Sequence, residues 1–201
     1  MTFRITPTSE LQAVNTLLSI IGEAPVSQIT SNTGVDVSIA IQILEETNVE
    51  VQSKGWHFNT DTEKTLVRDS DNKIPVASNV VQVDASKTYK KQYDITLRNG
   101  FLYDLENKTD VFTQSMVVDQ ITVQQFEHIP EYARKLIITK AGRKFQARMV
   151  GSSELAGFTQ QDENEAIVNA ERSDAANGDY NILTGDNGTF NIINRTQRRS
   201  Y

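Results

Sequence analysis

The chain has 201 residues and a formal net charge of −6, and its 38% apolar and 23% charged residues are typical of a globular protein of one domain or two small ones. The acidic balance argues against broad nucleic-acid binding, the lack of cysteine excludes disulfides and thiolate chemistry, and two histidines are too few for a His-rich metal site. No apolar run approaches the roughly 20 residues that span a bilayer, and the N-terminus lacks the apolar region of a signal peptide.

The first helix is predicted over residues 9–21, after a flexible arm formed by residues 1–8. Ser9-Glu10-Leu11-Gln12 is a capping box, in which the Ser hydroxyl and the Gln amide satisfy free N–H groups at a helix start. Apolar residues then recur at helical spacing. Gly22 and Pro25 end the pattern, because glycine closes helices and proline cannot continue them.

A second helix is predicted after the polar loop 28–34, with Asp36 as its N-cap and its end near Lys54. Apolar residues again recur along one side. The other side is expected to face solvent and carries Glu45, Glu46, Asn48, Glu50 and Gln52.

The stretch Gln52–Asn59, Gln-Ser-Lys-Gly-Trp-His-Phe-Asn, joins this helix to a region of different pattern. Gly55 can take the left-handed conformation that closes a helix. Trp56, the only tryptophan, and Phe58 are then expected to anchor the junction between a helical layer and a sheet. Because aromatic residues contribute mostly burial, we interpret Gly55, Trp56 and Phe58 as a structural seam rather than a ligand site.

Residues 60–127 change to a period of two, which predicts an inserted antiparallel β-subdomain. Asn99-Gly100 between alternating apolar residues favours a type I′ hairpin, since both turn residues tolerate positive φ. Further strands are expected at 65–67, 76–83, 111–112 and 116–126.

Two more helices are predicted, over 130–149 and 153–176, with Gly151 closing the first of them. The polar face of 130–149 is basic and that of 153–176 is acidic. Such opposite faces fit either antiparallel packing or contacts between subunits, and both interpretations stay open. The candidates for a subunit interface are Lys140, Arg143, Lys144, Glu163 and Glu165.

The tail 178–201 is rich in Asn, Gly and Thr, and nothing in it specifies a stable helix. It is predicted to be an extended arm that orders against a partner, the alternative being a terminus without function. Its candidate binding residues are Phe190, Ile192, Ile193, Arg195, Arg198 and Arg199.

The predicted fold class is therefore α+β. An antiparallel bundle of about four helices (1–59 and 129–177) carries the inserted β-subdomain (60–128) and ends in the C-terminal arm (178–201).

Motifs for catalysis or cofactor binding are absent from the sequence. There is no Gly-rich phosphate loop, no His-Glu-x-x-His, no EF-hand loop and no Gly-x-Ser-x-Gly. A glycosidase needs only two suitably separated acids, for which Glu127 and Asp119 are candidates. Nothing in their spacing singles them out, so solvated surface acids are the simpler interpretation, and we predict no catalytic residues, no cofactor and no metal.

Several segments resemble, in chain order, the tail tubular protein A family, the head–tail adaptors or gatekeepers of short-tailed, podovirus-type phages. The resemblance covers roughly residues 9–186. It rests on Ala13-Val14-Asn15, Ile21–Ser27, Gln52–Asn59, Pro130-Glu131, Arg134, Ile137–Ala141, Arg143-Lys144-Phe145, Glu163-x-Glu165-Ala166 and Tyr180–Asp186.

The resemblance implies a structural virion protein rather than an enzyme. Such adaptors form a dodecameric ring, assembled in the host cytoplasm, between the portal protein and the tail nozzle formed by a tail tubular protein B-like partner. A tail-fibre contact is a further implied partner, and no membrane contact is expected. DNA passes through the channel without specific binding, which fits the acidic balance because phosphate affinity comes from Lys and Arg. The resemblance also implies that the C-terminal arm embraces the portal.

Two alternatives stand beside this interpretation. Some members of the family are said to degrade polysaccharide, so an adaptor with hydrolase activity is one alternative. An unrelated helical binding module is the other.

Overall fold

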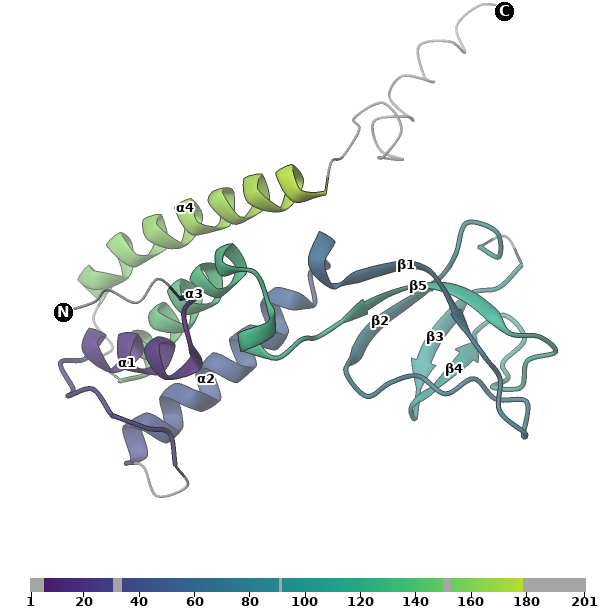
Figure 1. Ribbon diagram of the computed structural model, residues 1–201, viewed down its shortest axis with the longest axis horizontal. Helices are drawn as coiled ribbons and strands as arrows, with labels where there is room; N and C mark the ends of the chain where they lie inside the picture. The colour runs from purple at the N-terminus through teal and green to yellow at the C-terminus, as the bar shows by residue number, and fades with distance from the viewer. Residues whose placement is uncertain (1–5, 31–33, 91, 150–152, 179–201) are drawn as a thin grey trace, which may run out of the picture.

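The computed structural model describes residues 6–30, 34–90, 92–149 and 153–178. It combines helices with antiparallel sheets, as the α+β prediction states (Figure 1). Along the chain the elements are α1 (Glu10–Ile20), α2 (Val35–Gln52), the short 3-10 helix η1 (His57–Asn59), β1 (Thr60–Leu66), β2 (Val80–Ala85), β3 (Ile95–Arg98), β4 (Phe101–Asp104), β5 (Met116–Thr122), the 3-10 helix η2 (Phe126–His128), α3 (Glu131–Met149) and α4 (Ser153–Asn177).

Helix α1 begins as its sequence predicts. The Ser9 hydroxyl accepts a hydrogen bond from the Gln12 N–H, and the Gln12 side chain accepts one from the Ser9 N–H, which completes the capping box. Gly22 follows the helix with φ +81°, and nothing lies within 4 Å of the point that a Cβ would occupy. The left-handed turn is therefore the only constraint on this glycine.

Helix α2 differs from the prediction at both its start and its polar face. Gly34 is the N-cap and Asp36 lies inside the first turn, where its negative charge still suits the positive end of the helix. Gln52 is fully buried and Asn48 is half-buried, so neither belongs to a solvated face. Both side-chain amides bond to Gln124, in the segment that leads from β5 back to the helices. The pattern of a single helix cannot show such a contact.

The four helices share one hydrophobic core. Helix α3 packs against α1, α2 and α4, and its Phe145 and Ile137 are fully buried. Pro130 immediately precedes α3, and its carbonyl accepts the first bonds of the helix. The predicted closing residue, Gly151, lies outside the described residues. The buried members of this core are Ala13, Val14, Leu17, Leu18, Val37, Ala40, Ile43, Leu44, Val51, Trp56, Phe126, Ile129, Ala133, Leu136, Ile137, Ala141, Phe145 and Ala170.

The strands form a three-stranded antiparallel sheet in the order β1-β5-β2 and a separate hairpin, β3-β4. The hairpin is the one that the sequence predicts: Asn99 and Gly100 both have positive φ, +52° and +79°, as a type I′ turn requires. Central strand β5 alternates buried and half-buried residues, which fits one face turned to a core.

Four of the predicted strands differ from the structure. The strand predicted at 65–67 is the end of β1, which runs from Thr60 to Leu66. Residues 76–79 are not part of a strand: Pro75 makes an isolated bridge to Phe101, and β2 begins only at Val80. Residues 111–112 form no strand, although Phe112 is buried. Strand β5 ends at Thr122, before a connection to η2 that is fixed by side-chain bonds. Short apolar runs alone do not distinguish a strand from a buried loop.

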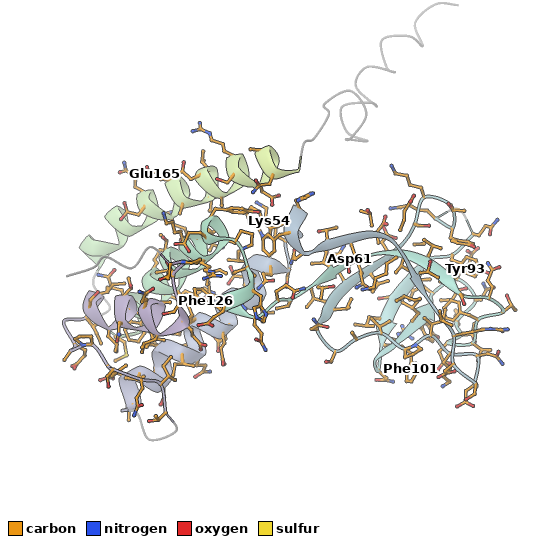
Figure 2. The ribbon with its side chains drawn as sticks, viewed as in Figure 1. Lys54, Asp61, Tyr93, Phe101, Phe126 and Glu165 are labelled. Carbon is orange, nitrogen blue, oxygen red and sulfur yellow. The ribbon has the colours of Figure 1, made fainter. Side chains whose placement is uncertain are left out.

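The helices and the strands lie at opposite ends of the molecule, joined by the ribbon of β1 and β5 (Figure 1). We call α1–α4 with η1 and η2 the helical unit, and residues 60–122 the β unit. Each has its own hydrophobic cluster. Phe126 belongs to the first cluster, whereas Tyr93 packs against the second, and the two aromatics lie far apart in Figure 2. The predicted domain boundaries at 59/60, 128/129 and 177/178 remain a prediction about independent folding.

Candidate functional site

The junction between the two units is built around Gly55. Gly55 has φ +78°, and a Cβ at this position would lie 2.8 Å from the Cδ1 of Ile121 on β5. The left-handed turn favours glycine here, and any larger residue would also have to displace the end of the Ile121 side chain. This is where helix α2 and the β1–β5 ribbon meet.

Trp56 lies in the core of the helical unit rather than between the helices and the sheet. Its side chain is 5% exposed, and its Nε1–H donates to the carbonyl of Val51 at 2.7 Å. Its ring lies 6.5 Å from that of Tyr132 on α3, and the half-buried Phe58 packs edge-on against the same Tyr132 at 6.2 Å. Trp56 and Phe58 therefore attach η1 to α3, and the direct contact with the sheet is made by Gly55.

A network of side-chain amides holds the segment that leads from β5 back to the helices. The sequence did not predict this network. The side chain of Gln52 donates to the Gln124 carbonyl and accepts from the Gln124 N–H, each at 2.8 Å. Asn48 donates to the same carbonyl at 3.2 Å, and Asn59 donates to the Gln52 carbonyl at 2.9 Å. A buried amide whose groups are all paired fixes one geometry, because leaving any of them unpaired is costly. The sequence signal that could have indicated this network was the position of Gln52 beside the apolar stripe of its helix.

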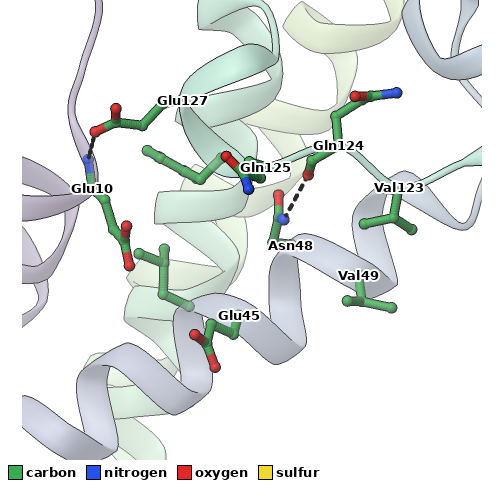
Figure 3. A pocket seen from close by; sticks show the side chains of 10 residues that line it. Glu10, Glu45, Asn48, Val49, Val123, Gln124, Gln125 and Glu127 are labelled. Carbon is green, nitrogen blue, oxygen red and sulfur yellow. Dashed lines mark hydrogen bonds between the residues drawn. The ribbon is translucent and has the colours of Figure 1, made fainter. Parts of the chain in front are cut away.

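A groove of about 540 Å³ lies next to this network, between α1, α2 and the segment 123–127 (Figure 3). Its apolar part includes the buried Leu44 and Phe126 and the more exposed Val49 and Val123. The carboxylates of Glu10, Glu45 and Glu127 lie at one end, and the amides of Asn48, Gln124 and Gln125 complete the lining.

The acids of the groove influence one another. The pKa of Glu10 is raised by its partial burial and, to a smaller extent, by the negative charges of Glu45 and Glu127. No ion pair involves any of these three carboxylates among the residues that the structure describes. Within the described residues, the end of the groove is therefore an acidic site without a cationic partner, beside apolar surface.

The predicted interface residues of α3 and α4 pair with each other inside one chain. Arg143 and Lys140 both contact Glu163, whose side chain is 11% exposed. Lys140 and Lys144 also reach Glu50 on α2, and these contacts lower the pKa of Glu50. The opposite charges of α3 and α4 are therefore explained by antiparallel packing of the two helices within one chain. Glu165 is exposed on α4 (Figure 2), and its interface role stays a prediction.

The C-terminal end of α4 is attached to the junction by a buried acid that sequence reasoning did not single out. Asp174 accepts the backbone N–H of His57 at 3.1 Å and the hydroxyl of Tyr132 at 2.7 Å. Lys54 adds an ion pair with Glu171 at 2.6 Å. Helix α4 is thus fixed to both α3 and η1.

The model of the family described as tail tubular protein matches residues 11–180. The chain belongs to the tail tubular protein family. It is accordingly a structural component of a phage tail. The match begins within α1 and runs to the end of α4 and beyond, so it covers both units. Among curated proteins, no sequence matches the chain.

The two hydrolase candidates of this tail tubular protein have separate surroundings. Asp119, on β5, accepts the backbone N–H of Glu63 at 2.8 Å, next to a bulge in β1. Glu127, in η2, accepts the Glu10 N–H at 3.4 Å and lines the groove. The structure brings Glu127 together with Glu10 and Glu45 rather than with Asp119.

In the described part of this tail tubular protein, no group of three or more His, Asp or Glu side chains could hold a metal ion. No helix there is long and apolar enough to cross a membrane. The six candidate residues of the C-terminal arm, Phe190, Ile192, Ile193, Arg195, Arg198 and Arg199, lie outside the described residues.

Proposed function

We propose that this tail tubular protein is a head–tail adaptor of the A type from a short-tailed phage. In this proposal several copies, twelve by the family resemblance, form a ring that joins the portal to the tail nozzle and lines the DNA channel. The observation that carries the proposal is the family match over residues 11–180, which takes in both units.

The arrangement of the units supports a bridging role. A protein that joins two different partners needs two surfaces, and the helical and β units offer them at opposite ends of the molecule (Figure 1). The polar junction, with its fully paired Gln52, holds the units together without sharing their apolar cores.

The charge of the chain supports a channel that does not bind its cargo. With 26 acidic and 20 basic residues, the subunit has a formal charge of −6. DNA phosphates gain affinity from Lys and Arg, and three of these on α3, Lys140, Arg143 and Lys144, are already paired with Glu50 and Glu163. A ring of such subunits would carry DNA with little attraction to its wall.

The test is reconstitution with purified portal and nozzle proteins. Sedimentation followed by electron microscopy should show a ring of this protein between the two partners, and no portal–nozzle complex without it. A complex that forms equally well without this protein, or a protein that binds neither partner, would contradict the adaptor function.

A further inference from the structure

The groove between α1, α2 and segment 123–127 has the surface of a binding site for an extended chain. Its apolar lining, with Val49 45% exposed, is continuous with three acids that have no cationic partner in the described structure. Occupation would therefore cover apolar surface and neutralise charge at once, both of which favour binding.

The chemistry of the groove specifies its occupant. An apolar floor takes aliphatic side chains, and the end formed by Glu10, Glu45 and Glu127 takes guanidinium or ammonium groups, with arginine favoured because its fork matches a carboxylate. The pKa of Glu10 is raised mainly by its partial burial and less by Glu45 and Glu127, and a cation beside Glu10 would offset both the buried charge and the repulsion.

One stretch of this chain has that composition. Residues 187–201 contain three arginines and no acid, and Ile192 and Ile193 stand just before Arg195. We propose that the groove of one subunit binds the C-terminal segment of a second copy, with the isoleucines on the apolar floor and the arginines at the acidic end. This rests on the proposed assembly of several copies, and it gives the segment a subunit partner in place of the portal contact that the resemblance implies.

The length of the segment permits such a contact. Twenty-three residues follow Gly178, the last described residue. Ile192 and Ile193 come 14 and 15 residues after Gly178, so an extended chain can carry them up to about 50 Å from the end of α4. A segment of that reach can leave its own subunit and contact a neighbouring copy. A contact in which each subunit holds the segment of the next is head-to-tail, and it closes into a ring when the rotation allows.

The absence of cysteine from the chain makes disulfide trapping a direct test. A full-length Val49→Cys chain, marked in the groove, is mixed with an Ile193→Cys chain under oxidising conditions. Docking should trap the mixed dimer about ten-fold or more faster than random collision, because the bound segment has a high effective concentration. The matched control is Val35→Cys, on the same helix at 74% exposure but outside the groove.

A chain carrying both substitutions distinguishes two copies from one. Docking between copies should give a ladder of covalent oligomers from the Val49→Cys/Ile193→Cys chain, whereas docking within one copy should give a covalently closed monomer. A closed monomer alone would overturn the proposal, and so would trapping at Val49 no faster than at Val35.

The charge requirement is tested in the same assay. Replacing Arg195, Arg198 and Arg199 by Gln, or combining Glu45→Gln with Glu127→Gln, should slow trapping about ten-fold. Glu46→Gln, an exposed change on α2 outside the groove, should leave the rate unchanged. If Glu46→Gln slowed trapping as much per charge removed as the Glu45→Gln/Glu127→Gln pair, the segment would be attracted by overall charge rather than by the groove.

The portal is the remaining occupant to distinguish. Suppose that the Ile193→Cys chain is trapped on portal protein, while the Val49→Cys chain traps it no faster than the Val35→Cys control does. The segment then binds the portal, and the proposal fails although the adaptor function stands. If the adaptor function fails in reconstitution with portal and nozzle, trapping between copies can still succeed.

Discussion

The helical unit and the β unit are built in different ways. The helical unit takes its core from both ends of the chain, since α1 and α2 pack against α3 from the other side of the insertion. The β unit closes locally, through a hairpin and a sheet whose strands all lie within residues 60–122. One unit therefore depends on contacts over long sequence separations, whereas the other can be completed by a single continuous segment.

The connection between the helical unit and the β unit is polar, and this determines how a substitution in one unit affects the other. The two hydrophobic clusters are separate. The junction is made by hydrogen bonds of side-chain amides and by the close approach of Gly55 to Ile121. We therefore expect substitutions in one core to leave the other folded, and changes at the junction to alter their connection.

The largest effect is expected at Trp56, in the helical core. Trp56→Ala opens a cavity and removes the donor to the Val51 carbonyl, so the free energy of unfolding of the helical unit should fall by about 3–5 kcal/mol. Chemical denaturation measures the loss, and amide exchange should show that β3–β4 stays protected. Val35→Ala, at an exposed position, is the control. A loss below about 1 kcal/mol would contradict the burial of Trp56.

The second effect is expected at the junction. Gln52→Ala leaves the N–H and the carbonyl of Gln124 without their side-chain partner, which should cost about 1–3 kcal/mol. Amide exchange at Gln124 should accelerate, because its N–H bonds to the Gln52 side chain. Gln42→Ala, at an exposed position of the same helix, should change neither quantity. An unaltered Gln124 exchange rate would mean that the backbone alone fixes the return chain.

These contrasts also show what the sequence could reveal. The capping box at Ser9 and the Asn99-Gly100 hairpin are local signals, complete within four residues or so, and the structure confirms both. The burial of Gln52 depends on a residue 72 positions away, and no pattern within α2 contains that information. Likewise the opposite charges of α3 and α4 were visible, but their pairing within one chain is a matter of tertiary packing.

The groove was missed for the same reason. Glu10, Glu45 and Glu127 come from three separate segments, and each looks like a solvated acid in its own helix or loop. Only the packing of α1 and η2 against α2 brings them together. The junction residues, by contrast, were partly predictable, because a glycine followed by the only tryptophan at a change of pattern marks a boundary.

A third, smaller effect concerns the ion pairs that hold α4. Glu163→Gln removes a largely buried acid from Arg143 and Lys140 and should cost about 1 kcal/mol, whereas Glu171→Gln breaks an exposed pair and should cost less than about 0.5 kcal/mol. Denaturation at low and high salt compares them, since screening weakens exposed pairs more. Equal losses at both positions would mean that burial adds nothing to the Glu163 contacts.

The smallest effect is a pH dependence of opposite sign at two glutamates of the helical unit. The hydrogen bond from Lys144, with help from Lys140, lowers the pKa of Glu50 in the folded state. Its contribution to stability is therefore present above the pKa of the unfolded chain and is lost as pH falls through the folded pKa. Burial and nearby acids raise the pKa of Glu10, so its ionised form costs stability, and that cost disappears as pH falls.

Two neutral substitutions separate these contributions. At pH 7, Glu50→Gln should lower the free energy of unfolding and Glu10→Gln should raise it, each by a few tenths of a kcal/mol because both side chains retain solvent contact. Near pH 3 both differences should shrink, since the wild-type carboxyls are then becoming neutral as well. Unfolding curves at the two pH values provide the measurement. If the two substitutions shifted stability in the same direction at pH 7, the charges around Glu50 and Glu10 would not differ as described. The acidic end of the groove would then not be an unneutralised site.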